Sequence, residues 1–305
     1  MSYNVEIFGI DLVIKPIAFS INIGNFHWDI YWYGIIIALG FALAVFYGFK
    51  NAKRFNINVD RMIDVALVTT PVAVLCARSY YLIFDDIKGN FNFKDFFGLD
   101  GSGFSGLAIY GGVIGAFLCG ALMCYLRKVN ILDMFDLAAL GFLIGQGIGR
   151  WGNFFNQEAF GGPTYSPFWG MQSENTIKEV GIGLVHPCFL YESVWCILGF
   201  VLIHILSKKR KFSGQVALMY GVWYGIGRAV IEGFRTDSLY LVGNIRVSQA
   251  LSILLAVVCA AVLVFMYIKL KGKGDYVAVY ENAADDAEQT EETVETSEEK
   301  VDENE

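Results

Sequence analysis

Long apolar runs dominate this chain and are separated by shorter polar stretches. Seven of the runs have close to the length at which a helix crosses about 30 Å of hydrocarbon. They lie at residues 31–49, 62–84, 107–126, 131–149, 188–206, 216–231 and 247–268. The sixth run is short, and the second contains Arg78. The pattern predicts an all-α integral membrane protein with seven transmembrane helices.

Basic residues in the short loops indicate the orientation of the chain, because such residues collect on the cytoplasmic side. The loops after runs one, three, five and seven carry them: Lys50, Lys53, Arg54, Arg61, Arg127, Lys128, Lys208, Lys209, Arg210, Lys211, Lys269, Lys271 and Lys273. The intervening loops are longer and mixed in sign. We therefore expect the N-terminus outside, the C-terminus in the cytoplasm, and a small extracytoplasmic head.

The two ends of the chain differ from its apolar centre. Residues 1–30 mix Ile, Val and Phe with Asn, Asp and Gly, which predicts short strands or an interfacial arm. Residues 275–305 are acidic and nearly free of large apolar side chains, so we expect a disordered cytoplasmic tail. The seven-helix domain then occupies residues 31–274 and includes a head loop at 150–187.

Composition supports the membrane assignment. Of the 305 residues, 55% are hydrophobic and only 17% are charged, against roughly 25% charged in soluble domains. The net charge of −7 is uneven, because the 12 acids and one base from Glu281 onward leave a net +4 elsewhere. The six cysteines form no CxxC pair or metal-ligand spacing with histidine, so we expect buried thiols, no metal and no cofactor. No cleaved signal peptide is expected.

Polar and charged side chains, which are energetically unfavourable inside a membrane, occur at the outer end of several runs. Run four ends in a glycine-rich stretch that leads directly into Arg150, and run six places four polar side chains on one helix face. The candidates are Tyr33, Arg78, Tyr110, Arg150, Asn153, Asn156, Glu158, Tyr224, Arg228, Glu232 and Arg235. Snorkelling arginines and an aromatic belt would account for Arg235 and Trp151. They account poorly for Arg78 and Arg228, and intramembrane charges are usually functional.

Arginines at one membrane depth indicate an anionic substrate. Guanidinium groups bind phosphate through paired hydrogen bonds and keep their charge. At the outer leaflet a phospholipid headgroup is the obvious anion. Glu232, one turn from Arg228, could either orient that guanidinium or neutralise it. Glycines four apart, at Gly111 and Gly115, Gly221 and Gly225, and Gly141, Gly145 and Gly149, predict close helix packing.

Several motifs together resemble a known family. The stretch Gly149-Arg150-x-Gly152-Asn153-Phe154-x-Asn156-x-Glu158-x-x-Gly161 resembles the signature of the bacterial prolipoprotein diacylglyceryl transferases. Further matches are Trp32-Tyr33-Gly34, Tyr110-Gly111-Gly112-Val113-Ile114-Gly115 and Tyr224-Gly225-x-x-Arg228-x-x-x-Glu232-x-x-Arg235, with a weaker one at His186-Pro187-x-x-x-Tyr191-Glu192. They follow the family's order and cover roughly residues 30–270.

The resemblance implies a multi-pass enzyme of the bacterial cell membrane. It would move the diacylglyceryl group of phosphatidylglycerol onto the lipobox cysteine of a prolipoprotein signal peptide, forming a thioether and releasing glycerol phosphate. Its partners would be these two substrates and bilayer lipids, without cofactor or nucleic acid. The family's catalytic arginines match Arg150 and Arg228, and its asparagine and glutamate match Asn153 and Glu158. The other candidates, Asn156, Gly161, Tyr33, Arg78, Tyr224, Glu232 and Arg235, would bind substrate.

One position departs from the best-studied form of the family. Some members carry histidine, the natural base near neutral pH, where this chain has Tyr110. A tryptophan often found before this motif is also replaced, by Phe104-Ser105-Gly106. The thiol proton could go to Glu158 or to an ionised Tyr110, or the arginine field could itself favour the thiolate. The base stays open.

A lipid or anion transporter is the alternative from another class of protein. It would use the same arginines but would need charged or broken-helix features in the inner half of the membrane as well. The inner halves of runs three, four and seven are almost free of charge. We therefore favour the transferase.

Overall fold

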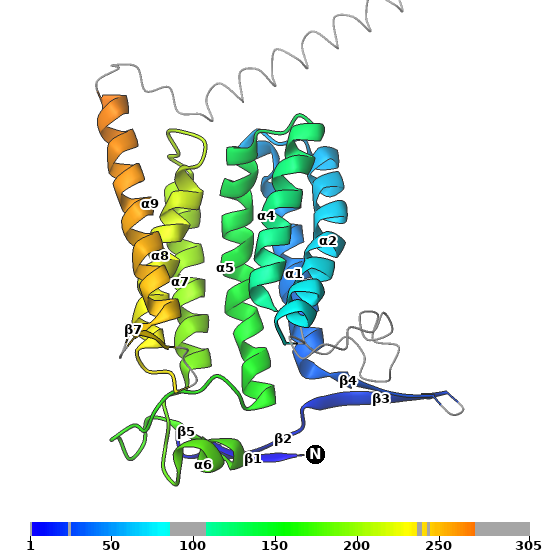
Figure 1. Cartoon of the computed structure of the whole chain (residues 1–305), viewed down its shortest axis with the longest axis vertical. Coiled ribbons are helices and arrows are strands. Elements are labelled where there is room, and N and C mark those ends of the chain that lie inside the picture. Colours follow the sequence, from blue (N-terminus) through cyan, green and yellow to red (C-terminus); the bar gives the residue numbers. More distant parts are fainter. Residues whose placement is uncertain (1, 24–25, 86–107, 237–239, 243–244, 272–305) are drawn as a thin grey trace, which may run out of the picture. The chain divides into compact units, whose positions relative to one another are not determined.

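All seven apolar runs form helices in the computed structural model, which describes residues 2–23, 26–85, 108–236, 240–242 and 245–271 (Figure 1). They are α1 (Trp32–Asn51), α2 (Val59–Asp85), α4 (Ile109–Leu126), α5 (Ile131–Asn156), α7 (Cys188–Ser207), α8 (Gln215–Glu232) and α9 (Val247–Lys271). A 3-10 turn η1 (Lys53–Phe55) and a short helix α6 (Glu174–Val180) add to them. The acidic tail and the Phe104–Gly106 segment lie outside the described residues.

Five of these helices, α1, α2, α5, α7 and α9, are long and apolar enough to cross a membrane. The described apolar part of α4, Tyr110–Leu126, is shorter. Helix α8 has 18 residues and includes Gln215, Arg228 and Glu232. The fold is thus that of a mainly helical membrane protein, while seven spans stay a prediction for α4 and α8.

The chain forms two compact units, residues 1–50 with 136–305, and residues 51–135. In the second unit, α2 packs closely on α4. A Cβ atom added to Gly111 would lie 2.4 Å from Cβ of Tyr80, and one added to Gly115 would lie 2.5 Å from Cβ of Cys76. Only glycine permits such an approach, so the predicted packing role of these two glycines is confirmed.

In the first unit, α8 packs on α9 through the other predicted glycine pair. A Cβ atom at Gly221 would lie 2.5 Å from Sγ of Cys259, and one at Gly225 would lie 2.7 Å from the carbonyl oxygen of Ser252. The third predicted set packs against α1, since a Cβ atom at Gly141 would lie 3.5 Å from Cβ of Ala44 and one at Gly149 would lie 3.1 Å from Cδ1 of Ile37. At Gly145 an added Cβ would meet nothing within 4 Å, so glycine is not required there.

The N-terminal residues form the strands that the sequence predicts. Strands β1 (Tyr3–Ile7), β2 (Ile10–Ile14) and β5 (Met171–Ser173) make one antiparallel sheet in the order β2-β1-β5. Strands β3 (Ile17–Ile23) and β4 (Phe26–Tyr31) form a hairpin, and β6 (Tyr240–Val242) pairs with β7 (Ile245–Arg246). Helix α6 follows β5 directly and begins with a capping box between Ser173 and Thr176.

A small apolar core joins the three-stranded sheet to the ends of α5 and α7. Its buried members are Val5, Ile14, Phe154, Phe160, Met171, Val185 and Phe189. The rings of Phe154 and Phe189 stack with centroids 4.8 Å apart. Burial of each large side chain contributes about 1.5–3 kcal/mol. This core fixes the last turn of α5 against the first turn of α7, and both turns carry candidate site residues.

A buried ion pair holds the other end of the first unit. Asp136 and Arg210 are both 0% exposed, and their side chains meet at 2.7 Å. The Asp136 carboxylate also accepts hydrogen bonds from the backbone N–H groups of Gly214 and Ala217, both at 2.8 Å. It thereby satisfies N–H groups that have no partner within α8. The sequence analysis counts Arg210 among the loop charges, but the residue is buried in the core. Because Asp136 lies in the inner half of run four, that half is also less free of charge than predicted.

Candidate active site

Helix α5 continues beyond the predicted end at Gly149, so Arg150, Asn153 and Asn156 lie in its last two turns. The helix ends where Gln157 adopts a left-handed conformation, with φ of 53°. The N–H of Glu158 then bonds back to the Asn153 carbonyl at 3.1 Å. This is the Schellman arrangement of a helix C-terminus. It turns Glu158 back toward the asparagines of the same helix.

The side chains of this turn form a hydrogen-bonded chain. The amide of Asn153 donates to Oε1 of Glu158 at 2.9 Å, and the amide of Asn156 donates to the same oxygen at 3.4 Å. Nη1 of Arg150 donates to Oδ1 of Asn153 at 3.4 Å. The structure thus brings four residues of the predicted signature together on a single helix end.

Glu192 on α7 links the two predicted phosphate-binding arginines. Its Oε1 lies 2.5 Å from Nη2 of Arg150 on α5, and its Oε2 lies 3.2 Å from Nη1 of Arg228 on α8. The Glu192 side chain is only 3% exposed. The hydroxyl of Tyr224 donates to Oε1 at 3.3 Å. A buried carboxylate is stable here because it is paired and hydrogen-bonded.

The polar face predicted along α8 is present for Tyr224, Arg228 and Glu232. The prediction is wrong for Arg235, which lies beyond the end of the helix at Glu232. Nη2 of Arg228 forms an ion pair of 2.7 Å with Glu232, one turn further along the helix. Glu232 is buried, and its backbone carbonyl accepts a hydrogen bond from Arg246 in β7. Arg228 therefore lies between two carboxylates, which orients its guanidinium group and balances its charge at the same time.

Tyr33 and Arg235 also belong to this cluster. Gly152 faces the ring of Tyr33 so closely that an added Cβ would lie 2.6 Å from it. The backbone N–H of Arg235 donates to the Glu232 carbonyl at 3.3 Å, which keeps Arg235 next to the end of α8.

Gly161 has a backbone role. Its N–H donates to the His186 carbonyl at 2.9 Å, and Gly161 forms an isolated bridge with Arg235. A Cβ atom at Gly161 would lie 2.7 Å from Cβ of His186. The close packing of three chain segments therefore requires glycine at this position.

Arg78 and Tyr110 belong to the second unit and are described apart from the cluster. Arg78 is buried in α2, with its guanidinium 5.8 Å from the centre of the Tyr81 ring. Tyr110 is the second residue of α4 and is 53% exposed. The N–H of Ala108 bonds to the Ala77 carbonyl at 3.1 Å. Both candidates thus lie beside the same crossing of α2 and α4.

A polar triad links the segment between α5 and α7 to the first turn of α7. The indole N–H of Trp169 donates to the Tyr191 hydroxyl at 2.7 Å, and that hydroxyl lies 3.1 Å from Nδ1 of His186. Burial lowers the pKa of His186 below its ordinary value.

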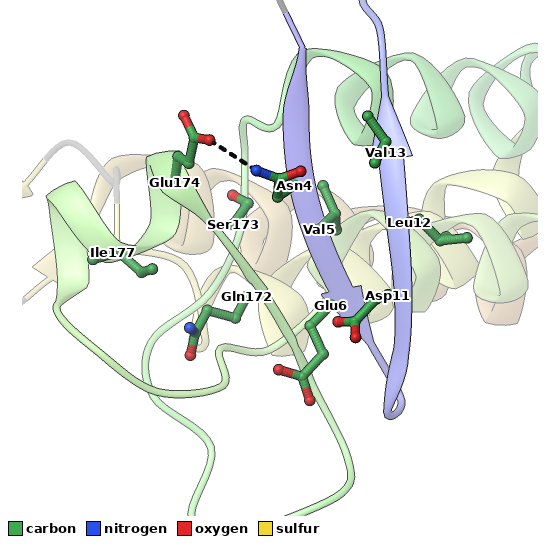
Figure 2. Close-up of a pocket in the computed structure, with 10 residues that line it drawn as sticks. All are labelled: Asn4, Val5, Glu6, Asp11, Leu12, Val13, Gln172, Ser173, Glu174 and Ile177. Carbon is green, nitrogen blue, oxygen red and sulfur yellow. Dashed lines mark hydrogen bonds between the residues drawn. The ribbon is translucent and has the colours of Figure 1, made fainter.

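A separate cavity of about 420 Å³ lies between the three-stranded sheet and α6 (Figure 2). The acids Glu6, Asp11 and Glu174 line it, and its described lining contains no lysine or arginine. An anionic headgroup would be repelled there. Among the described residues, no group of three His, Cys, Asp or Glu side chains could hold a metal ion.

Two residues of this cluster had no role assigned from the sequence. Glu192 was seen as part of the weaker motif that begins at His186, but its central place between two arginines was missed. A carboxylate within the first two turns of an otherwise apolar helix was the available signal. Arg246, which donates to the Glu232 carbonyl, gave no comparable signal.

Comparisons with known proteins agree on one family. The family model described as prolipoprotein diacylglyceryl transferase matches residues 16–266. A phosphatidylglycerol–prolipoprotein diacylglyceryl transferase of Clostridioides difficile (strain 630) is 40% identical over 247 residues, covering 81% of this chain and 94% of that protein. One from Clostridium perfringens (strain 13 / Type A) is 41% identical over 271 residues, covering 87% and 100%. One from Lysinibacillus sphaericus (strain C3-41) is 38% identical, covering 87% and 97%.

Proposed function

Because this chain belongs to the prolipoprotein diacylglyceryl transferase family, we propose that its arginine cluster carries out that transfer. The enzyme moves the diacylglyceryl group of phosphatidylglycerol onto a cysteine thiol of a prolipoprotein, making a thioether and releasing glycerol phosphate. The acceptor is the lipobox cysteine of the signal peptide. The observation that carries the proposal is the arrangement of Arg150 and Arg228 around the buried Glu192.

The two arginines hold the phosphate of the lipid. Each guanidinium group has five N–H donors, and each makes two polar contacts with the described residues, Arg150 with Glu192 and Asn153, and Arg228 with Glu192 and Glu232. Donors therefore remain on both groups for phosphate oxygens. Glu192 and Glu232 fix the two groups before substrate arrives, which is the preorganisation that electrostatic catalysis needs.

Transfer is a displacement at the glycerol carbon that bears the phosphate. The thiol sulfur forms the new C–S bond while the C–O bond to phosphate breaks. The electron pair of that bond passes to the departing phosphate oxygen, and the thiol proton passes to a base. Arg150 and Arg228 stabilise the growing negative charge on the phosphate. Asn153 and Asn156 orient Glu158 beside Arg150, and Tyr33 and Tyr224 line the approach of the thiol.

We favour Glu158 as the proton acceptor, because it is exposed and held by two amides beside Arg150. In water a carboxylate is about four pKa units less basic than a thiolate. Guanidinium groups close to the sulfur reduce this difference by favouring the thiolate. A glutamine at Glu158 should then lower turnover most at low pH, where the thiolate is scarce. An unchanged pH profile would exclude Glu158 as the base. Tyr110 as the base, or thiolate formation favoured by the arginine field, would then be the explanations that are left.

The chain crosses the bacterial cell membrane seven times, with the N-terminus outside and the C-terminus in the cytoplasm. The alternation of basic loops supports this orientation. Residues 1–30 and the 150–187 region then form the extracytoplasmic part, and residues 275–305 form a cytoplasmic tail. A fluorescent protein that folds only in the cytoplasm, fused to the C-terminus, should fluoresce. A dark fusion that is present in the membrane would contradict this topology.

The decisive experiment gives the enzyme two acceptor peptides. Membranes containing the wild-type chain are incubated with phosphatidylglycerol and a lipobox peptide that has either Cys or Ser at the acceptor position. The Cys peptide should gain the mass of the diacylglyceryl group, with release of glycerol phosphate, and the Ser peptide should not. No gain on either peptide would contradict the transferase and favour a transporter.

A further inference from the structure

Two tryptophans join α7 to α8 in a reciprocal manner. The rings of Trp195 on α7 and Trp223 on α8 stack with centroids 4.3 Å apart and planes 17° apart. The indole N–H of Trp195 donates to the backbone carbonyl of Trp223 at 2.9 Å. The indole N–H of Trp223 donates to the carbonyl of Trp195 at 3.0 Å. We call this pair the tryptophan clasp.

A glycine on the opposite helix receives each indole ring. A Cβ atom on Gly227 would lie 2.1 Å from Nε1 of Trp195, and one on Gly199 would lie 2.3 Å from Nε1 of Trp223. Each glycine follows the clasp tryptophan of its own helix by four residues. The contact is therefore symmetric, and an added methyl group on either glycine would push the helices apart or shift them.

The clasp adjoins the arginine cluster on both helices. Glu192 precedes Trp195 by three residues, so it lies about one turn away on α7. Tyr224 directly follows Trp223, and Arg228 directly follows Gly227 on α8. Every contact that Glu192 makes with α8 thus depends on the register that the clasp fixes.

Directional contacts of this kind matter because two apolar helices in lipid have no hydrophobic force that would select one register. A buried indole N–H also needs a partner. A slip by one residue would move Glu192 by about 1.5 Å along the helix axis. That shift would lengthen its 3.2 Å contact with Arg228 beyond hydrogen-bonding range.

We propose that the tryptophan clasp is a positioning device for the transferase reaction, which keeps Glu192 between Arg150 and Arg228 by fixing α7 on α8. The proposal rests on the proposed function of the arginine cluster. It assigns positioning roles, through Glu192, to Trp195, Trp223, Gly199 and Gly227.

The test uses small changes on the two helices and a matched control. Gly227→Ala and Gly199→Ala insert a methyl group into the clasp, whereas Gly145→Ala on α5 adds one where nothing lies within 4 Å. A displacement of about 1 Å can cost on the order of 100-fold in rate. We expect kcat per folded molecule to fall at least about 10-fold in the clasp variants, with KM for phosphatidylglycerol nearly unchanged. Gly145→Ala should match the wild type.

A double-mutant cycle separates positioning from general stability. Trp195→Phe keeps an aromatic ring but removes the indole donor, and it is combined with Glu192→Gln. If the clasp acts through Glu192, the combined loss is smaller than the product of the two single losses. Losses that multiply, or clasp variants with unchanged kcat per folded molecule, would overturn the proposal.

A spectroscopic measurement keeps this proposal separable from the proposed function. Stacked indoles give an exciton couplet in circular dichroism, which Trp195→Phe and Gly227→Ala should remove and Gly145→Ala should keep. A wild-type chain with the couplet but without product would overturn the transferase assignment, and the positioning role in that reaction would fall with it, while the clasp itself would stand as a helix contact. Loss of the couplet in Gly227→Ala with full transfer would overturn the positioning role alone.

Discussion

Oε1 of Glu192 lies 2.5 Å from Nη2 of Arg150, although the two residues are 42 positions apart and belong to different helices. The same carboxylate reaches Arg228 with its other oxygen, so one buried acid fixes the spacing of both phosphate-binding groups. Removing it would leave the repulsion between two partly buried arginines uncompensated at this point. The first prediction follows from this arrangement.

Glu192→Gln should lower kcat by about 100-fold or more, because a neutral amide cannot balance two guanidinium groups. Glu192→Asp should also be impaired, since the shorter side chain cannot span both arginines. Initial rates with phosphatidylglycerol and the Cys peptide provide the measurement. Wild-type rates in Glu192→Gln would show that the bridge has no catalytic role.

Arg228→Lys should abolish detectable transfer while the protein remains in the membrane. Lysine keeps the charge but cannot hold two carboxylates and a phosphate with one compact ammonium group. Arg127→Lys is the matched control, because that residue forms an exposed pair with Asp64. Activity of Arg228→Lys close to that of the control would contradict the assigned role.

Asp136→Asn should destabilise the protein by about 3 kcal/mol or more, because it removes the carboxylate that pairs with the buried Arg210 at 2.7 Å. Asp64→Asn breaks an exposed pair and should cost less than about 1 kcal/mol. The two variants are compared by unfolding in detergent, which is monitored through the reactivity of cysteines that become exposed. Equal midpoints would show that the buried pair contributes little.

Gly161→Ala should destabilise the fold by about 1–3 kcal/mol through overpacking. The new Cβ would lie 2.7 Å from Cβ of His186 and 2.9 Å from Sγ of Cys188. Gly34→Ala adds a methyl group where nothing lies within 4 Å and should be silent. A stable Gly161→Ala protein that fails only to bind phosphatidylglycerol would instead support a direct substrate role for this glycine.

His186 should make the protein less stable in acid. Burial lowers the pKa of His186 in the folded protein, so the unfolded chain takes up this proton first as the pH falls below about 6.5. The free energy of unfolding should therefore decrease between about pH 7 and pH 5. His186→Asn should show a smaller decrease over the same range. Identical pH dependence in both proteins would contradict this assignment.

Local patterns were enough to predict the helices and most of the cluster. An apolar run in lipid must satisfy its backbone hydrogen bonds internally, and hence becomes a helix. Residues four apart on α8 must share a face, which places Tyr224, Arg228 and Glu232 together without any tertiary information. The end of α5 was placed too early, because Arg150 and Asn153 looked like loop residues and only the Gln157 turn ends the helix.

Partner choice between helices could not be predicted in the same way. The sequence shows that Asp136 and Arg210 carry charge, but their pairing at 2.7 Å depends on how α5 meets the loop before α8. Gly145 and Gly221 look alike in a pattern of small residues, yet an added Cβ would clash with the neighbouring helix only at Gly221. Such contacts depend on helix rotation and crossing, which no single segment encodes.

By itself the sequence determined the class of protein, its helices, its family resemblance and the two arginines, because each follows from hydropathy, helical spacing or a long motif. The tertiary structure decided how those arginines are held. Glu192 lies between them only because the Phe154–Phe189 core and the tryptophan clasp place α7 against α5 and α8. A charge in lipid is stable only with a partner, and which partner it finds is a property of packing.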